Sequence, residues 1–277
     1  MCRKRVDDPM STAAPAREVT NSQGFQRLAR LGLATRAAIY LLIGWLAILI
    51  ARGEPGKAAD QRGALQEVVQ QTGGTMLMWV IVAGLIGYSL WRFSEAAFGV
   101  TGEGRTKGPR LQSFARGCIY TFFAVSAMNL LVDSAHPSMA SQEQMMTARM
   151  MVHPWGRWAV GIAGAVVIGV GAALVYEGLA RKFEKRLKSF TMTPTQRKVV
   201  VGLGIVGTSA RGVVFGLVGL LLIRAAVDFD PQKARGLDGA LRSLAQTDAG
   251  PWLLYAAAAG LLVFGIYGMA EAGWART

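Results

Sequence analysis

Thr35-Arg36-Ala37-Ala38-Ile39-Tyr40 opens a long apolar run, and the chain repeats this pattern twice. The copies are Ala115-Arg116-Gly117-Cys118-Ile119-Tyr120 and Ala210-Arg211-Gly212-Val213-Val214-Phe215. Each copy is followed by a polar connection and then by a second apolar run, which ends at Glu95, Glu177 or Glu271. Self-similarity of this kind is typical of proteins built from one repeated supersecondary unit. The sequence therefore predicts three copies of a two-helix hairpin.

Six stretches are long and apolar enough to cross a bilayer, because about 20 helical residues span a hydrocarbon core of about 30 Å. They lie near 33–51, 76–98, 111–132, 156–176, 199–226 and 252–270. A soluble core has no need of six helices that are apolar on every face. We therefore expect an all-α integral membrane protein of six transmembrane helices. Three parallel two-helix repeats predict pseudo-threefold symmetry, and the outer loops are expected to carry short amphipathic helices.

The repeats also suggest how the chain is divided. The expected segments are a disordered cytoplasmic tail at 1–26, hairpin repeat 1 at 27–99, hairpin repeat 2 at 111–178, a basic amphipathic linker at 179–198 and hairpin repeat 3 at 199–273. Repeat 2 is degenerate, since it lacks the Gly-Ala-Leu loop signature found at 63–65 and 239–241. The first 20 residues have no apolar core and do not resemble a signal peptide.

Positive charge is distributed unevenly between the two sides of the predicted bundle. Of the 30 Lys and Arg residues, 21 lie on the side that carries both termini and the linkers between hairpins, and 9 lie on the opposite side. Excess positive charge stays in the cytoplasm, so both termini are expected to be cytoplasmic. This distribution accounts for the net charge of +13 without a nucleic-acid partner.

The candidate site is a ring of charged residues at the cytoplasmic end of the bundle. Its members are the arginines that begin the odd helices and the glutamates that end the even ones: Arg36, Arg116, Arg211, Glu95, Glu177 and Glu271. Ionisable groups near hydrocarbon usually face the bundle interior and pair, so we expect three Arg–Glu pairs, with Arg211 and Glu271 of the third hairpin as one of them. The alternative is that each Arg snorkels to the headgroups and each Glu only marks a helix end. A paired ring would either hold the helices together or gate a pathway.

An aromatic residue follows each motif arginine by four positions, on the same helix face: Tyr40, Tyr120 and Phe215. Such a ring can pack over the guanidinium or anchor the helix at the membrane interface. Glycines form further stripes, as in Gly212-x-x-x-Gly216 and Gly161-x-x-Gly164. These stripes favour close helix packing over helix unwinding around a ligand.

The linker between repeats 2 and 3 combines apolar residues at helical spacing with basic ones. The apolar positions are Leu179, Phe183, Leu187 and Phe190, and the basic ones are Arg181, Lys182, Lys185, Arg186 and Lys188. A basic amphipathic stretch suits the anionic lipids of the inner leaflet. Docking to a protein surface is the alternative.

No residue pattern demands a metal, a cofactor or catalysis. Met146, Met150 and His153 lie in a Met-rich outer loop, where thioethers could bind Cu(I) but where Met also serves as adaptable apolar filler. We therefore expect no metal. Gly202-x-Gly204-x-x-Gly207 imitates a dinucleotide fingerprint, but it lies inside an apolar span rather than a strand–turn–helix unit. Paired carboxylates, zinc-spaced ligands and nucleophile–base pairs are absent from the sequence pattern, so no cofactor and no enzymatic activity are expected.

The repeated motifs resemble those of the bacterial membrane family known as domain of unknown function 1206. The resemblance rests on the three Arg-containing openings, on the Gly-Ala-Leu signature and on the Ala-Gly-Leu…Trp-Arg-x-x-Glu segment at 83–95, which has a relative at 259–271. It covers about 27–273, with a degenerate middle repeat. It implies a bacterial plasma-membrane location and six helices, and no activity.

Two classes of function remain. The favoured one is a non-catalytic scaffold or accessory subunit, with the lipid bilayer and other membrane proteins as partners. The alternative is a transporter or channel for a small solute or ion, with a pathway along the pseudo-threefold axis gated by the Arg–Glu ring. Few polar residues, among them Ser89, Ser126 and Asn129, lie in the predicted spans, which disfavours a site for a polar solute.

Overall fold

The computed structural model consists of helices of two lengths. It describes residues 23–53, 58–98, 107–132, 148–149, 155–187, 189–228, 230, 237–245 and 250–274. The long helices are α2 (Gln23–Ala51), α4 (Gly74–Phe98), α5 (Lys107–Val132), α7 (Gly156–Leu179), α8 (Pro194–Asp228) and α10 (Gly250–Trp274). All six are long and apolar enough to span a membrane, which confirms the predicted all-α fold with six spans, while the pseudo-threefold symmetry stays a prediction. Of the expected tail at 1–26, residues 1–22 lie outside the described part.

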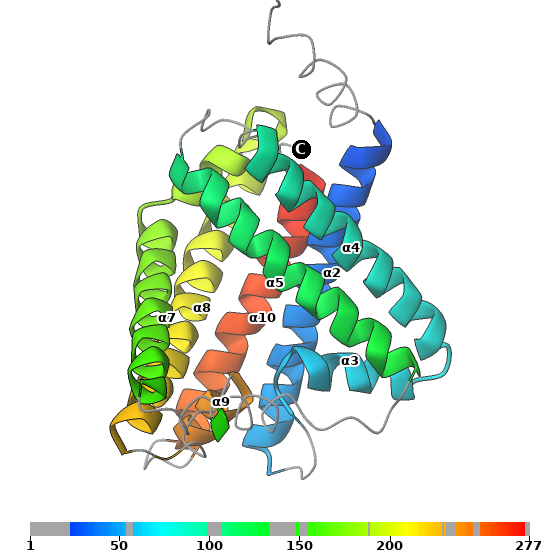
Figure 1. Cartoon of the computed structure of the whole chain (residues 1–277). Helices are drawn as coiled ribbons and strands as arrows, with labels where there is room; N and C mark the ends of the chain where they lie inside the picture. Colours follow the sequence, from blue (N-terminus) through cyan, green and yellow to red (C-terminus); the bar gives the residue numbers. More distant parts are fainter. Residues whose placement is uncertain are drawn as a thin grey trace, which may run out of the picture.

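Two short helices, α3 (Gln61–Gln70) and α9 (Leu237–Ala245), lie together at one end of the bundle (Figure 1). The carboxylate of Asp60 caps α3 by accepting a hydrogen bond of 2.7 Å from the Gly63 amide. The Ala59 amide donates to Asp238 of α9 at 2.9 Å. A side chain at Gly63 would run into the Ala58 carbonyl. The Gly-Ala-Leu signature therefore belongs to a contact that joins the outer loops of repeats 1 and 3.

The most extensive helix packing joins successive repeats rather than the two helices of one hairpin. α4 packs against α5, α7 against α8, and α10 against α2. Figure 1 shows the α7–α8 pair on one side of α10 and α2, and the α4–α5 pair crossing α10 and α2 diagonally. Inside the hairpins, α2 contacts α4 and α8 contacts α10. Among the described residues, α5 and α7 of repeat 2 make no comparable contact.

A single sequence position explains why the middle hairpin differs. In repeat 1, a side chain at Gly84 of α4 would collide with Thr35 of α2, and in repeat 3 a side chain at Gly260 would collide with Ala210 of α8. Both glycines precede the closing glutamate by eleven residues, and the same position in repeat 2 is Val166. Val166 is exposed. Small residues allow helix backbones to approach in lipid, so repeat 2 lacks the residue that closes the other two hairpins.

The α7–α8 contact depends on four glycines. Side chains added to Gly171 and Gly212 would each come within 2.6 Å of the other residue's carbonyl oxygen. Gly164 and Gly219 face one another in the same way, at 2.8 and 2.6 Å. Of the predicted small-residue stripes, Gly164 and Gly212 lie in backbone-to-backbone packing, whereas a side chain at Gly161 would meet only the Ala226 Cβ, at 3.6 Å, and one at Gly216 would meet nothing within 4 Å.

The linker between α7 and α8 does not form the amphipathic helix that its spacing predicts. It contains two 3₁₀ turns, η1 (Lys182–Arg186) and η2 (Ser189–Thr191), and enters η1 through Arg181 with a φ of 54°. Phe183 and Leu187 are buried in the main hydrophobic core, and the Phe183 ring lies 5.3 Å from that of Tyr267. The expected lipid-facing apolar stripe is therefore wrong at these two positions, because the bundle itself buries them.

The basic residues of the linker remain on the surface where the structure describes them. Arg181, Lys182 and Lys185 are exposed, and the ammonium of Lys182 lies 4.4 Å from the ring centroid of Tyr176. The side chains of Arg186 and Lys188 lie outside the described residues. Contact of this basic group with anionic lipids stays a prediction.

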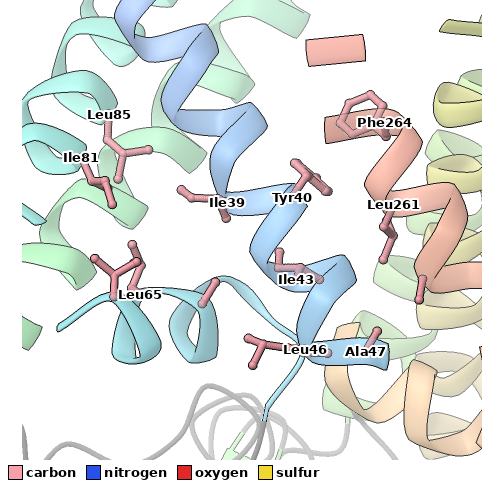
Figure 2. Close-up of a cluster of buried hydrophobic side chains, with 14 of the residues drawn as sticks. Ile39, Tyr40, Ile43, Leu46, Ala47, Leu65, Ile81, Leu85, Leu261 and Phe264 are labelled. Carbon is pink, nitrogen blue, oxygen red and sulfur yellow. The ribbon is translucent and has the colours of Figure 1, made fainter. Parts of the chain in front are cut away.

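The main core surrounds α2 and continues into α3, α4 and α10. Figure 2 shows Ile39 and Leu46 on the side of α2 that faces Leu65 of α3 and Ile81 and Leu85 of α4, and Tyr40 on the side that faces Leu261 and Phe264 of α10. Ile43, Leu85 and Leu261 are completely buried. The region where α2 meets α3, α4 and α10 is consequently filled with apolar side chains.

Candidate functional site

A buried ion pair joins the first and third repeats. Nη2 of Arg36 on α2 lies 2.5 Å from Oε2 of Glu271 on α10, and both side chains are only 9% exposed. The expected partner of Glu271 was Arg211, from the same hairpin, so this part of the prediction is wrong. The reason is the packing order, because α10 packs more extensively on α2 than on its own hairpin partner α8. Gly268 permits this approach, since a Cβ there would lie 2.8 Å from that of Ala37.

Glu95 is bonded in its own helix and in the next repeat. Its Oε2 accepts from Nη1 of Arg92 at 2.7 Å and from the hydroxyl of Ser113 on α5 at 3.0 Å. All three groups are buried. Glu95 of repeat 1 therefore contacts the first helix of repeat 2, and Glu271 of repeat 3 contacts the first helix of repeat 1.

Tyr88 lies at the centre of the cluster and is completely buried. Its hydroxyl accepts hydrogen bonds from Nε and Nη2 of Arg92 at 2.9 and 2.7 Å, and from Nη1 of Arg36 at 3.4 Å. Its ring contacts that of Tyr120 edge-on, with 4.4 Å between centroids. Arg116 lies within electrostatic range of Tyr88. One tyrosine thus links guanidinium groups from different helices.

Arg211 has a different environment. Its guanidinium carbon lies 5.1 Å from the ring centroids of Tyr40 and Phe215 and 4.9 Å from that of Phe264. Its buried Nε has no hydrogen-bond partner. Two of the three motif aromatics, Tyr40 and Phe215, therefore pack over a motif guanidinium, while the third, Tyr120, packs on Tyr88.

The structure brings most of the predicted ring into one region. Arg36 and Arg211 both lie within electrostatic range of Tyr120, and Arg36 is bonded to Glu271. Glu177 is half-buried on α7. Met146, Met150 and His153, the weak metal candidates, lie outside the described residues.

Sequence reasoning missed Tyr88, Arg92 and Phe264. A usable signal existed, because Tyr88 and Phe264 each precede the closing glutamate by seven residues. Two helical turns place such a residue on the same face as the glutamate. The equivalent residue in repeat 2 is Val170, which is exposed. Aromatic residues at this position therefore accompany the two glutamates whose ion pairs are described here.

Replacing Tyr88 by Phe tests the central hydroxyl. The variant should lose about 1–3 kcal/mol of stability, because two buried Arg92 nitrogens lose their shared acceptor. Unfolding of the detergent-solubilised protein measures this loss. Tyr176→Phe is the matched control, since Tyr176 is exposed and its replacement should change stability by less than about 0.5 kcal/mol. Equal stability of the two variants would contradict the assigned role.

The fold and the cluster together define a six-helix integral membrane protein made of three repeats with a buried Arg–Glu–Tyr network. The chain belongs to the family described as Domain of Unknown Function (DUF1206), whose model matches residues 31–99, 111–181 and 199–275. The resemblance inferred from the sequence is thereby confirmed. The chain is also 31% identical over 245 residues to "Uncharacterized protein YxxB" of Bacillus subtilis (strain 168), a match that covers 87% of this chain and 88% of the relative. No solved structure matches the chain.

Proposed function

We propose that the protein is a non-catalytic scaffold or accessory subunit of the bacterial plasma membrane, with both termini in the cytoplasm. The observation that carries this proposal is the dense apolar packing around α2 (Figure 2). A pathway for a polar solute would need a polar or open route through the bundle, whereas completely buried aliphatic side chains such as Ile43 and Leu261 fill the region around α2.

The position of the charged cluster favours the stabilising role over the gating role. Arg36, Arg92, Glu95 and Glu271 are each at least 92% buried and bonded to one another or to Tyr88 and Ser113. Breaking such a network costs several kcal/mol, which suits a permanent connection between helices better than a gate. The location and orientation rest on the excess of Lys and Arg on the side of the termini and on the bacterial origin of the relative.

The outer surface has the apolar character that a lipid-embedded partner would contact. Large apolar side chains are exposed on α5 and α7, including Phe114, Phe122, Trp158, Ile162 and Val166. In a membrane, association between helices depends on packing and interhelical hydrogen bonds rather than on hydrophobicity. These faces are therefore available both to lipid and to the helices of another membrane protein.

Accessibility of single cysteines tests whether the bundle is dry. In a variant without Cys2 and Cys118, Ile43→Cys and Leu261→Cys should resist a membrane-impermeant thiol reagent in a reconstituted bilayer. Gln71→Cys, at an exposed position between α3 and α4, should react and serves as the positive control. Labelling at Ile43→Cys or Leu261→Cys in a protein that still elutes as one species would mean a wet interior and would favour the transporter alternative.

A further inference from the structure

Arg211 differs from the other arginines of the cluster in its partners. Arg36 and Arg92 are each bonded to a carboxylate and to the Tyr88 hydroxyl. Within the described part of the chain, the partners of Arg211 are three aromatic rings, those of Tyr40, Phe215 and Phe264. Its Nε is buried and makes no hydrogen bond, as is also true of the Arg36 Nε, but Arg36 has a carboxylate partner at Nη2 and Arg211 has rings alone. Among the described residues, aromatic rings therefore surround the Arg211 guanidinium, and no acceptor oxygen is bonded to it.

The three rings do not satisfy the hydrogen-bond donors of the Arg211 guanidinium. Ring faces attract the cation, but they offer no lone pair to an N–H group in the way that a carboxylate does. A charge removed from water is strongly destabilising unless it is paired and hydrogen-bonded. Ionisable residues inside membrane segments therefore mark functional sites by default.

Arg211 is only partly buried. Tyr40 and Phe264 behind it are buried, whereas Arg211, Phe215 and Tyr120 are half-buried. α5, which carries Tyr120, packs on α4 and α3, while α8, which carries Arg211, packs on α7, α10 and α9. In the described ranges, α5 has no comparable contact with α7 or α8. Arg211 and Tyr120 therefore belong to two groups of helices that do not pack extensively on one another in the described ranges.

We propose that Arg211 anchors a binding site for a phosphate oxyanion, carried by a lipid headgroup or free in solution. A planar guanidinium offers a fork of N–H donors that matches two oxygens of one phosphate. Tyr120 lies within electrostatic range of Arg211, and a tyrosine hydroxyl can donate to the same anion. The three rings fix the plane of the fork and thereby reduce the entropic cost of binding. This site does not depend on the proposed scaffold role, because a dry bundle can bind an anion at its side.

Titration of the detergent-solubilised full-length protein tests this site. Phosphatidylglycerol, inorganic phosphate and phosphatidylcholine are added separately, and native mass spectrometry with thermal unfolding reports binding. Arg211→Gln should weaken binding of the phosphate-bearing probe by roughly tenfold or more, as expected when charge-assisted hydrogen bonds are lost. Arg224→Gln is the matched control, because Arg224 lies on the same helix and is exposed, and it should leave the affinity unchanged.

The titrations distinguish a lipid headgroup from free phosphate as the ligand. Binding of phosphatidylglycerol without binding of inorganic phosphate identifies a lipid headgroup, and binding of both identifies the free oxyanion as sufficient. Binding no tighter than that of phosphatidylcholine in the wild-type protein overturns the proposal, as does wild-type affinity in Arg211→Gln. If Arg211→Gln does not fold, Arg211→Lys decides, because it keeps the charge but lacks the fork: unchanged affinity overturns the proposal and weaker affinity supports it. The phosphate test can be read whether cysteine labelling shows a dry or a wet interior. Failure of the phosphate site and failure of the scaffold proposal are therefore distinguishable.

Discussion

Replacing Glu271 by Gln is expected to lower the free energy of unfolding by about 3–5 kcal/mol, the usual cost of removing one partner from a buried ion pair. The substitution keeps the shape of the side chain but leaves the Arg36 guanidinium charged and buried, with side-chain exposure of 9%. The pair joins the last helix of repeat 3 to the first helix of repeat 1. Its loss should therefore weaken the central α2–α10 contact rather than an isolated hairpin.

Equilibrium unfolding of the purified protein in mixed micelles measures this effect. Glu184→Gln is the control, because the Arg197–Glu184 pair is far more exposed, at 57% and 21%, and exposed pairs contribute less than about 1 kcal/mol. A loss in Glu271→Gln no larger than that in Glu184→Gln would show that Arg36 does not depend on this carboxylate.

Exchanging the two charges refines the test. Arg36→Glu combined with Glu271→Arg should recover only part of the loss. The aromatic faces of Tyr88 and Phe264 lie 5.8 and 5.7 Å from the Arg36 guanidinium carbon, and a carboxylate at position 36 would lose those contacts. Recovery in this double variant, and none when Arg211→Glu is combined with Glu271→Arg, would establish the pairing across repeats.

The sequence could predict the helices but not which repeats contact each other. Apolarity and length are local properties, so the six spans follow from them directly. The arginine and glutamate of a motif lie at the same end of the bundle whether they pair within a hairpin or across two. The actual partner depends on the packing of α10 on α2, which small residues such as Gly265 and Gly268 permit. That information is tertiary, and spacing alone does not contain it.

The linker between α7 and α8 shows a second limit of prediction from the sequence. Its apolar residues recur at helical spacing, which identifies a buried face but does not say what buries it. In the structure, Phe183 lies against Gly204, where the ring occupies the place of a side chain. A Cβ added to Gly207 of the same Gly-x-Gly-x-x-Gly pattern would lie 2.5 Å from the Phe264 Cα. Two of the three glycines that imitate a nucleotide-binding fingerprint, Gly204 and Gly207, therefore make room for aromatic residues of the bundle.

Replacing Gly212 by Val should be among the most disruptive single changes in α8. The new side chain would meet the Gly171 carbonyl oxygen at 2.6 Å and the Val175 amide nitrogen at 2.8 Å. Backbone atoms cannot rotate away as a flexible side chain can, so α7 and α8 must separate. Overpacking of this kind typically costs about 1–3 kcal/mol and occasionally more, and we expect the upper end or beyond.

Gly216→Val is the matched control on the same helix, because a side chain there meets nothing within 4 Å. It should alter stability by no more than about 1 kcal/mol, the helix-propensity range. Proteolysis of the reconstituted protein adds a local readout. Since α7 packs chiefly on α8 and η1 among the described elements, Gly212→Val should expose the ends of α7 to cleavage before α2 or α10. Simultaneous loss of all helices, or equal effects at Gly212 and Gly216, would mean that the α7–α8 contact does not depend on this close approach of the two backbones.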